Sequence, residues 1–366
     1  MSSQKNLDRV RDRLAAASAE SDLDSGALAG LRLISRANTR LRESNALLRV
    51  SEARVVELEQ AVAIFEALSQ RAQKPIRVPK RRQKKGEKKR HIFVALLSDT
   101  HSSEVVDPVE CPLAGPDGHN AEIGEARMRA YFRSVAMLWR EQSASFEIPT
   151  IVLSLMGDFM VNSLMHDDSS TDLAPMEEVT YVFDLLREGI EYLLENTGAD
   201  LLIPTVFGNH GRITPKQYHS RAASVSAEHL VYEMLASTIT DKRITWDVRP
   251  QIIKTLEVEG FKILLTHGDR TSGMGGYGGG IGGLTIPFKK AIARWNANEN
   301  GIGVACIGHF HTPTIVSGHP AGFVNGSLVG PTPYSQGMDN HRPQQWCFLV
   351  DVQRQQVGRI LPVWVD

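Results

Sequence analysis

The sequence predicts a mixed α/β domain of the α+β type, preceded by a helical arm. Glycine and proline are nearly absent from residues 1–70, where Ala, Leu, Glu and Arg dominate, as they do in helices. From about His91 onward, short apolar runs alternate with stretches of helical composition, which is typical of mixed folds. The later apolar runs follow one another closely, so the second half of the chain is expected to be richer in strands.

The first 70 residues are expected to form a helical arm, with a short helix over about 4–20 and a longer one over about 27–70. In the longer helix, apolar residues recur at a spacing of seven, at Ile34, Leu41, Leu48, Val55 and Val62. The second heptad position is weak in the middle, because it holds Ala37, Ser44, Ser51, Leu58 and Phe65. Two interpretations remain open. One is a coiled coil over residues 27–70 that joins copies of the chain or binds a partner helix. The other is a helical hairpin.

A strongly basic segment follows the arm. Between Arg71 and Arg90 there are eleven lysines and arginines against one acid, Glu87, so the segment carries about +10. Because the whole chain has a net charge of −1, the remainder is acidic. Blocks of like charge repel themselves, so residues 71–91 are interpreted as a linker between an arm (1–70) and a main domain (92–366). Such a block would bind a phosphate backbone, so nucleic acid is the expected partner.

The elements of the main domain follow from its apolar runs and helical stretches. Strands are expected at 92–98, 148–156, 200–207, 243–248, 251–258, 261–266, 303–307, 313–317, 321–324, 346–351 and 359–365. Helices are expected at 121–142, 175–196 and 221–236. A hairpin turn is expected at 258–261.

Polar residues of one chemical kind stand directly after five of these strands. They are Asp99 and His101, Asp158, Asn209 and His210, His267, and His309 and His311. Ligand sites in α/β sheets lie at the carboxyl ends of strands, so the five loops can converge on one point. The members of each Asp-x-His or His-x-His pair are two residues apart, which would place both side chains on one side of an extended backbone.

Carboxylate, imidazole and amide groups suit divalent cations such as Mn, Fe, Zn, Ni or Co. Two such cations about 3.5–4 Å apart can stabilise both oxygens of an in-line phosphoryl displacement and supply a metal-bound hydroxide. Each motif alone is weak, but five in this order predict a two-metal phosphoesterase.

The motifs resemble those of the calcineurin-like metallophosphoesterase superfamily. That pattern is Asp-x-His, Gly-Asp, Gly-Asn-His, a separate His, and Gly-His-x-His, and the resemblance covers residues 92–350. It implies an αββα sandwich of two mixed sheets. It also implies that Asp99, His101 and His311 hold one metal, that Asn209, His267 and His309 hold the second, and that Asp158 bridges them. Mn is the metal that this resemblance favours.

In the resemblance, His210 and Asp158 are the catalytic residues, and His210 protonates the leaving oxygen. The family usually has Asp or Glu after the Gly-Asn-His motif, whereas this sequence has Gly211 followed by Arg212. Two alternatives follow: another acid orients His210, or Arg212 contributes to phosphate binding.

A glycine-rich stretch over 272–283 follows His267 and is interpreted either as a lid over the site or as a surface loop. Gly275, Gly276 and Tyr277 in this stretch are candidate substrate contacts. The stretch resembles loops of phage-type, DNA-processing members of the family, as does the segment 325–330.

These features together predict a metal-dependent phosphodiesterase or nuclease that acts on DNA. A phosphomonoesterase or cyclic-nucleotide phosphodiesterase is the enzymatic alternative. A scaffold that uses the helical arm is the non-enzymatic one. The three cysteines have no paired spacing, and the sequence shows neither an apolar signal core nor a membrane span, so a cytoplasmic protein is expected, in host cytoplasm if it is phage-encoded.

Overall fold

The structure is a computed structural model. It describes residues 34–42, 44–46, 48–49, 52, 77–78, 88–161, 170–216, 218, 220–270, 281–299, 301–333, 335 and 341–365. The chain divides into two units, residues 1–70 and 71–366. No helix among the described residues has the length and apolar character needed to span a bilayer.

The described part of the arm is helical and exposed. Residues 34–42, 44–46, 48–49 and 52 are helical, and every one of them is exposed. The heptad residues Ile34, Leu41 and Leu48 are 59%, 59% and 56% exposed. The later heptad residues Val55 and Val62 lie outside the described residues. The coiled coil therefore stays a prediction, and three of its apolar positions are more than half exposed.

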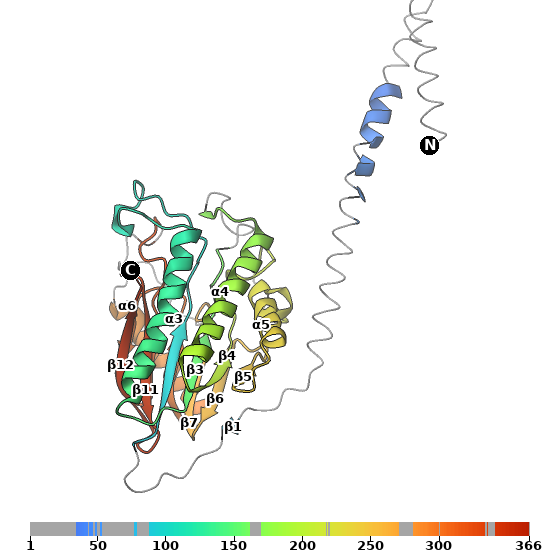
Figure 1. The fold of residues 1–366 in the computed structure, drawn as a ribbon. Coiled ribbons are helices and arrows are strands. Elements are labelled where there is room, and N and C mark those ends of the chain that lie inside the picture. The colour runs from blue at the N-terminus through green and yellow to red at the C-terminus, as the bar shows by residue number, and fades with distance from the viewer. Residues whose placement is uncertain are drawn as a thin grey trace, which may run out of the picture. The chain divides into compact units, whose positions relative to one another are not determined.

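Two mixed sheets form the centre of the main domain, each with six strands among the described residues (Figure 1). The first runs in the order β1 (Arg77–Val78), β6 (Ile253–Val258), β7 (Phe261–Thr266), β8 (Ile302–Ile307), β10 (Ala321–Val324) and β9 (Thr314–Val316). The second runs in the order β12 (Gln356–Trp364), β11 (Gln344–Asp351), β2 (His91–Leu97), β3 (Thr150–Leu155), β4 (Asp200–Pro204) and β5 (Ile244–Asp247). Strands β2 to β5 pair in parallel, so their carboxyl ends share one edge.

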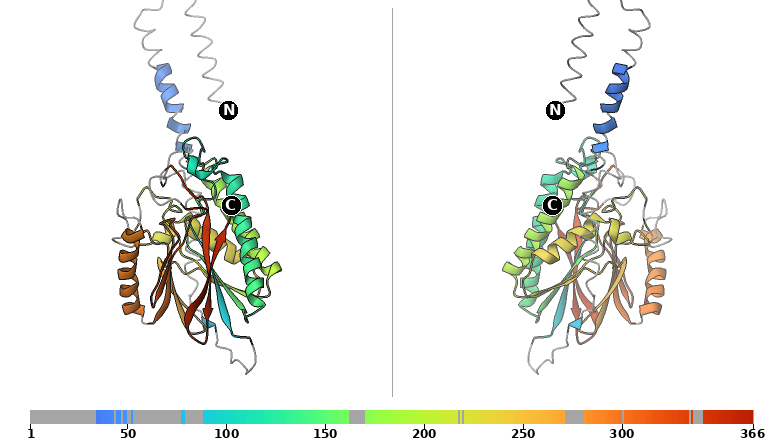
Figure 2. Two further views of the ribbon diagram at one scale, coloured as in Figure 1. Left: turned by 90° about the vertical axis from the view of Figure 1, so that its left-hand side faces the viewer. Right: turned by 90° about the vertical axis from the view of Figure 1, so that its right-hand side faces the viewer.

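Helices cover the outer face of each sheet (Figure 2). The helices α3 (Ala121–Ser143), α4 (Pro175–Asn196) and α5 (Ala227–Thr238) pack on the second sheet, and α6 (Ile281–Glu299) packs on the first. Short 3-10 helices occur at η1 (Pro112–Ala114) and η3 (Ala222–Val225). The layer order confirms the predicted αββα sandwich.

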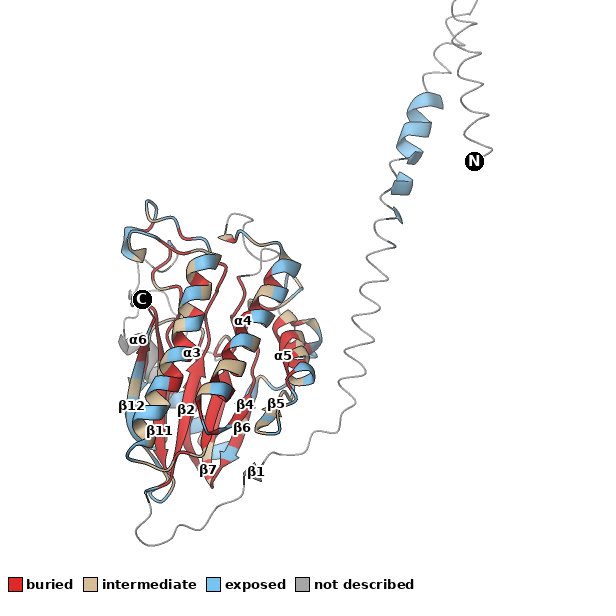
Figure 3. Cartoon of the chain, in the orientation of Figure 1, coloured by how far each residue is buried: buried red, intermediate tan, exposed pale blue. Residues whose placement is uncertain are grey.

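Alternating side chains of the central strands explain the layers. In β2, Phe93, Ala95 and Leu97 face the helices, whereas Ile92, Val94 and Leu96 face the other sheet. Every residue of β2 is buried, as Figure 3 shows for the central strands. A strand that is buried on both faces reads as a continuous apolar run, and for that reason it was visible in the sequence.

The sequence prediction differs from the fold in two places. Helix α6 was not predicted, because Gly282, Gly283 and Pro287 lie in its first half and disfavour helix. Two residues of the predicted linker form β1, which pairs in parallel with β6. The last linker residues are anchored as well, because the Arg90 guanidinium, 8% exposed, lies 2.6 Å from the Glu259 carboxylate.

Candidate metal centre

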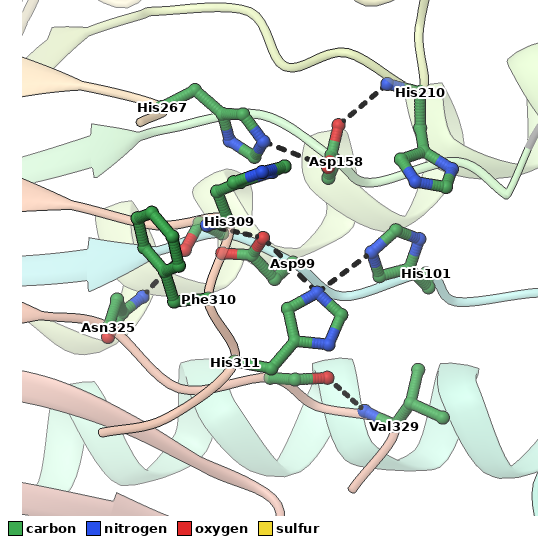
Figure 4. A network of polar contacts seen from close by, with 12 residues as sticks. Asp99, His101, Asp158, His210, His267, His309, Phe310, His311, Asn325 and Val329 are labelled. Carbon is green, nitrogen blue, oxygen red and sulfur yellow. Dashed lines mark hydrogen bonds and ion pairs between the residues drawn. The ribbon is translucent and has the colours of Figure 1, made fainter. Parts of the chain in front are cut away.

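Five loops meet at one edge of the sandwich. Three follow β2, β3 and β4 of the second sheet, and two follow β7 and β8 of the first. Backbone hydrogen bonds join neighbouring loops: the Asp99 amide donates to the Gly157 carbonyl at 2.9 Å, and the Gly308 amide donates to the His267 carbonyl at 2.9 Å. The structure thus brings the seven predicted metal ligands together. Figure 4 labels all of these ligands except Asn209, with His210 beside them.

The backbone of the loops is not extended, contrary to the sequence-based expectation for the paired motifs. Asp99, His101, Asp158, His309 and His311 all have positive φ angles, between 37° and 71°. Asp and His tolerate this left-handed region better than most residues. At these five ligands the side chains converge because the chain turns sharply, and not because alternate residues of a strand share a face.

Two glycines leave room for the carboxylates. A Cβ atom on Gly208 would lie 2.0 Å from Asp158 Oδ1, and one on Gly308 would lie 2.4 Å from Asp99 Oδ2. Any larger residue would push the carboxylate out of place. The glycines that precede Asn209 and His309 in the motifs are thus required by close packing against the neighbouring loop.

One candidate cation position is formed by Asp99, His101 and His311, called here the Asp99 group. Each residue offers a ligand atom, and these atoms lie within 4.8 Å of one another. His311 Nε2 is 3.4 Å from Asp99 Oδ1 and 3.3 Å from His101 Nε2. Asp99 Oδ2 is buried without a hydrogen-bond partner in the described structure, as expected of a carboxylate oxygen placed to bind a cation.

A second position is formed by Asp158, His267 and His309, called here the Asp158 group. Their ligand atoms also lie within 4.8 Å of one another. His267 Nε2 is 2.9 Å from Asp158 Oδ2 and 3.2 Å from Asn209 Oδ1, so the amide of Asn209 adjoins this group. Asp158 and His267 are 1% and 0% exposed. The donor types and their burial fit a divalent cation in each group.

Backbone carbonyls fix which nitrogen of two histidines faces the centre. His101 Nδ1 lies 3.1 Å from the Met160 carbonyl, and His267 Nδ1 lies 2.9 Å from the Met156 carbonyl. Since a carbonyl only accepts, each Nδ1 carries the proton and each Nε2 is the ligand atom. Such hydrogen bonds are the usual support of metal-binding histidines.

Burial and neighbouring charges shift the pKa values of these groups. Burial lowers the pKa of His101 well below its usual value, and the charges of His210 and His311 lower it further, so this imidazole is neutral and able to bind a cation. Burial opposes charge on Asp158 and His267 as well. Their mutual attraction is stronger, and it lowers the pKa of Asp158 and raises that of His267. A cation in the Asp158 group would replace the proton of His267.

His210 lies on the Asp158 side of the centre. Its amide donates to Asp158 Oδ1 at 2.8 Å, and its Nδ1 lies 2.9 Å from the Val161 carbonyl. Its ring is 4.6 Å from that of His101. Among the described residues, Nδ1 of His210 thus contacts a backbone carbonyl, whereas the family pattern has an acid after this histidine.

Two buried glutamates that the sequence analysis missed support the Asp158 loop. Glu228 on α5 accepts from the amides of Phe159 and Gly208, at 2.7 and 2.8 Å. Glu178 on α4 accepts from the Val161 amide at 2.6 Å. Glutamates in amphipathic helices normally face solvent, so the one signal available in the sequence was their position on the apolar face of each helix.

Glu228 also explains the departure at Gly211. A Cβ atom on Gly211 would lie 2.6 Å from Glu228 Cγ, so the glutamate side chain fills the space that an acid at position 211 would enter. Burial, followed by the charge of Asp158, raises the pKa of Glu228 to about 8. An acid carried by α5 therefore lies where the family sequence carries one in the loop.

The predicted substrate contacts are only partly described. Arg212 donates to the Asn209 carbonyl at 2.5 Å, so its guanidinium lies against the ligand loop. Gly275, Gly276 and Tyr277 lie outside the described residues, as does most of the glycine-rich stretch, whose last residues 281–283 belong to α6. The segment 325–330 adjoins the centre, because the Leu328 amide donates to the Asp99 carbonyl at 3.2 Å.

Comparisons with known proteins gave no matching family model and no matching curated protein. Among solved structures, the chain is similar to Zn²⁺-bound wild-type Vps29 from Entamoeba histolytica, with 13% identity, 75% of this chain and 99% of that chain covered, and a TM-score of 0.30. It is similar to a dimetal phosphatase from Danio rerio, with 9% identity, 75% and 99% covered, and a TM-score of 0.34. It is also similar to a predicted phosphoesterase from Streptococcus pneumoniae, with 12% identity, 74% and 97% covered, and a TM-score of 0.27.

The residues of the chain itself indicate the class: two mixed sheets lie between helices, and the five motifs stand at the loops of one edge in the order of the superfamily pattern. The αββα layers of the chain and its residue groups that can hold metal ions are those that the resemblance to the calcineurin-like metallophosphoesterases implies.

Proposed function

We propose that the protein is a dinuclear-metal-dependent phosphodiesterase that acts on DNA. The observation that supports it most is the adjacency of the Asp99 and Asp158 groups, each able to hold a cation. The His309 amide donates to Asp99 Oδ1 at 2.8 Å, so a residue of one group is hydrogen-bonded to the carboxylate of the other. Two divalent cations in these groups would polarise the phosphoryl oxygens and activate water.

The protein's own residues would bind the cations, orient the phosphate and supply a proton. Asp158 is proposed as the bridging carboxylate, because its ligand atoms lie within 4.8 Å of those of His267 and His309 and also of that of His101 in the Asp99 group. Asn209 is proposed as a neutral ligand beside it. With Nδ1 of His210 directed at a carbonyl, Nε2 is the ring nitrogen proposed to protonate the leaving oxygen. Arg212 is proposed to contact the phosphate from the Asn209 loop.

The choice of DNA rests on the basic segment Arg71–Arg90. Its eleven cationic side chains precede the domain directly, and in a chain of net charge −1 they concentrate the positive charge in one place. Neutralising several phosphates gives an affinity that falls steeply with salt. Manganese is the proposed metal; the donor set also suits Fe, Zn, Ni and Co.

Two other functions have support of their own. The same groups would serve a phosphomonoesterase or a cyclic-nucleotide phosphodiesterase, since the cation positions do not distinguish these esters. The exposed heptad residues Ile34, Leu41 and Leu48 favour a scaffold role in which the arm joins copies or binds a partner helix.

The deciding assay compares bis-p-nitrophenyl phosphate, p-nitrophenyl phosphate, and linear and circular DNA, each with Mn²⁺ and with chelator. We expect metal-dependent cleavage of the diester and of DNA. Asp158→Asn should abolish it, and Asp184→Asn, an exposed α4 carboxylate paired with Arg187, should not. Cleavage of the monoester alone would replace the proposal by a phosphatase. No turnover by metal-loaded protein would leave the arm as the functional part.

The basic segment is tested by changing Lys80, Arg81, Arg82, Lys84 and Lys85 to Gln. If these residues contact phosphates, the slope of log Kobs against log salt should become less negative by up to about 4.5, at ~0.9 per contact. Diester hydrolysis should stay at the wild-type rate. An unchanged salt slope would remove the argument for DNA.

A further inference from the structure

Glutamates of α4 and α5 accept hydrogen bonds from amides of the segment Phe159–Val161, which follows Asp158. Carbonyls of the same segment contact His101 and His210. We propose that Glu178 is a positioning residue that fixes this segment and, through its carbonyls, sets the ring tautomers of His101 and His210. The kinetic part of this inference rests on the proposed function. The tautomer part concerns the metal-free protein and stands independently of it.

Glu178 is 1% exposed and lies in the first turn of α4, where the helix dipole favours a carboxylate. Its Oε1 accepts from the Val161 amide at 2.6 Å and from the Ser103 hydroxyl at 2.5 Å. Ser103 lies two residues after His101. One carboxylate oxygen therefore joins the loop after β2 to the loop after β3, at the base of the two histidines.

The first link from Glu178 runs through a single peptide group to His101. The Val161 amide that donates to Glu178 belongs to the same peptide as the Met160 carbonyl, and that carbonyl lies 3.1 Å from His101 Nδ1. An acceptor on the N–H side of a peptide polarises its carbonyl and strengthens the hydrogen bond made there. Glu178 thereby favours the His101 tautomer with the proton on Nδ1 and the Nε2 lone pair toward the cation position.

The second link runs through Val161 itself to His210. The Val161 amide is held by Glu178, and the Val161 carbonyl lies 2.9 Å from His210 Nδ1. Holding the amide restricts rotation of the residue, so the carbonyl stays directed at the imidazole. The residue after His210 is Gly211 and not an acid. The contact that orients His210 comes from the Val161 carbonyl, which Glu178 holds in place.

Glu228 holds the same segment from the other end, since it accepts from the Phe159 amide at 2.7 Å. Glu228 contacts the Asp158–Phe159 peptide, which precedes the Met160 and Val161 carbonyls. Glu178 contacts the Met160–Val161 peptide. Its loss is therefore expected to move Asp158 and Asn209 more than the two histidine tautomers. Glu178 and Glu228 can be separated by experiment for this reason.

The test is ¹⁵N NMR of the histidine side chains in the full-length, metal-free protein, for wild type, Glu178→Ala, Glu178→Gln and Glu188→Ala. Glu188 is the matched control, an exposed glutamate of α4 that bonds Arg129. We expect His101 and His210 to carry the proton on Nδ1 in wild type and control. In Glu178→Ala both should become tautomer mixtures, and Glu178→Gln, which keeps an acceptor oxygen, should restore the wild-type pattern.

In the kinetic arm, kcat for bis-p-nitrophenyl phosphate should fall about 10- to 100-fold in Glu178→Ala and recover in Glu178→Gln. If Glu178→Ala does not fold, Glu178→Asp, which withdraws the carboxylate by one methylene, takes its place with a smaller shift expected. A folded variant in which both histidines keep the proton on Nδ1 would overturn the inference. Because the NMR arm needs no turnover, an inactive wild type would refute the proposed function without touching this one.

Discussion

The two halves of the metal centre are supported by different chemistry. The Asp158 loop is held by the buried carboxyl groups of Glu178 and Glu228. The start of the Asp99 loop is held by neutral amides: Gln345 accepts from the Ser98 amide at 3.0 Å and donates to the Ser98 carbonyl at 3.1 Å, and Asn325 donates to the Ser98 hydroxyl at 3.0 Å. Glu178 contacts this loop only further along, at Ser103. Supporting acids add negative potential only when they are ionised, as Glu228 is above about pH 8, whereas supporting amides add rigidity alone.

This difference has a consequence for cation binding. Coulombic attraction makes an acidic surrounding favour a cation, and the effect is stronger where water is excluded. The Asp158 group is also the tighter of the two, with its carboxylate–imidazole contact at 2.9 Å against 3.4 Å in the Asp99 group. The first cation is therefore expected to bind in the Asp158 group.

The largest effect should come from the two carboxylates themselves. Asp158→Asn should weaken binding of both cations, because this residue is the proposed bridge, and the first affinity should fall more than about 100-fold, the upper limit for outer contacts. Asp99→Asn should weaken only the second cation. Calorimetric titration with Mn²⁺ measures both steps. Equal losses in the two variants would contradict the proposed order of binding.

The next effect tests the amide support. In Gln345→Leu the side chain keeps its approximate size, but the amide and carbonyl of Ser98 and the carbonyl of Gly326 lose their partner inside the protein. At ~1–3 kcal/mol for each unpaired buried group, the free energy of unfolding should fall by about 4 kcal/mol. Urea denaturation measures the change. Gln353→Leu, at a turn position on the surface, is the control, and a loss below about 1 kcal/mol in Gln345→Leu would show that the amides are dispensable.

A pH effect of about 3 kcal/mol is expected from His119, whose Nδ1 lies 2.7 Å from the Glu104 carbonyl. Burial lowers the pKa of His119 to about 4, and its Nε2 is buried without a partner in the described structure. The folded pKa lies below the unfolded value near 6.5. The stabilisation is thus fully present above pH 6.5 and is lost as the pH falls toward 4, at ~1.4 kcal/mol per pKa unit. His119→Asn should lose this part of the pH dependence in urea titrations at pH 7 and pH 4, and His319→Asn, at an exposed position, should retain it.

The smallest effect on stability is expected at Gly211, which packs against Glu228. Gly211→Ala places a Cβ atom 2.6 Å from Glu228 Cγ, and relieving that contact should cost about 2 kcal/mol of stability. Gly198→Ala is the control, because its Cβ would meet Trp139 at an ordinary 3.7 Å. Thermal unfolding measures both. A Gly211→Ala protein as stable as wild type would mean that Glu228 moves aside easily and does not hold the loop.

The sequence predicted structure correctly where a residue type has one common structural role. Buried strands appeared as apolar runs, and the ligands appeared because Asp, Asn and His rarely stand together after five strands. Glu178 and Glu228 could not be found in this way, since nothing in a helical pattern separates a buried acid from an exposed one. Helix α6 was missed because its contacts with the first sheet outweigh the weak propensity of its glycines. The left-handed turns depend on neighbouring loops, which spacing does not reveal.

Five residues of the centre share the left-handed backbone conformation, in which glycine is less strained than Asp or His. At ~1–3 kcal/mol each, this strain opposes folding in the absence of metal. Heat resistance and metal binding therefore favour different residues at the same positions, namely glycine for stability and Asp or His for the metal centre. A library selected only for heat resistance should acquire glycine at positions 99, 158 and 309 early, and would lose the metal centre as it gained stability.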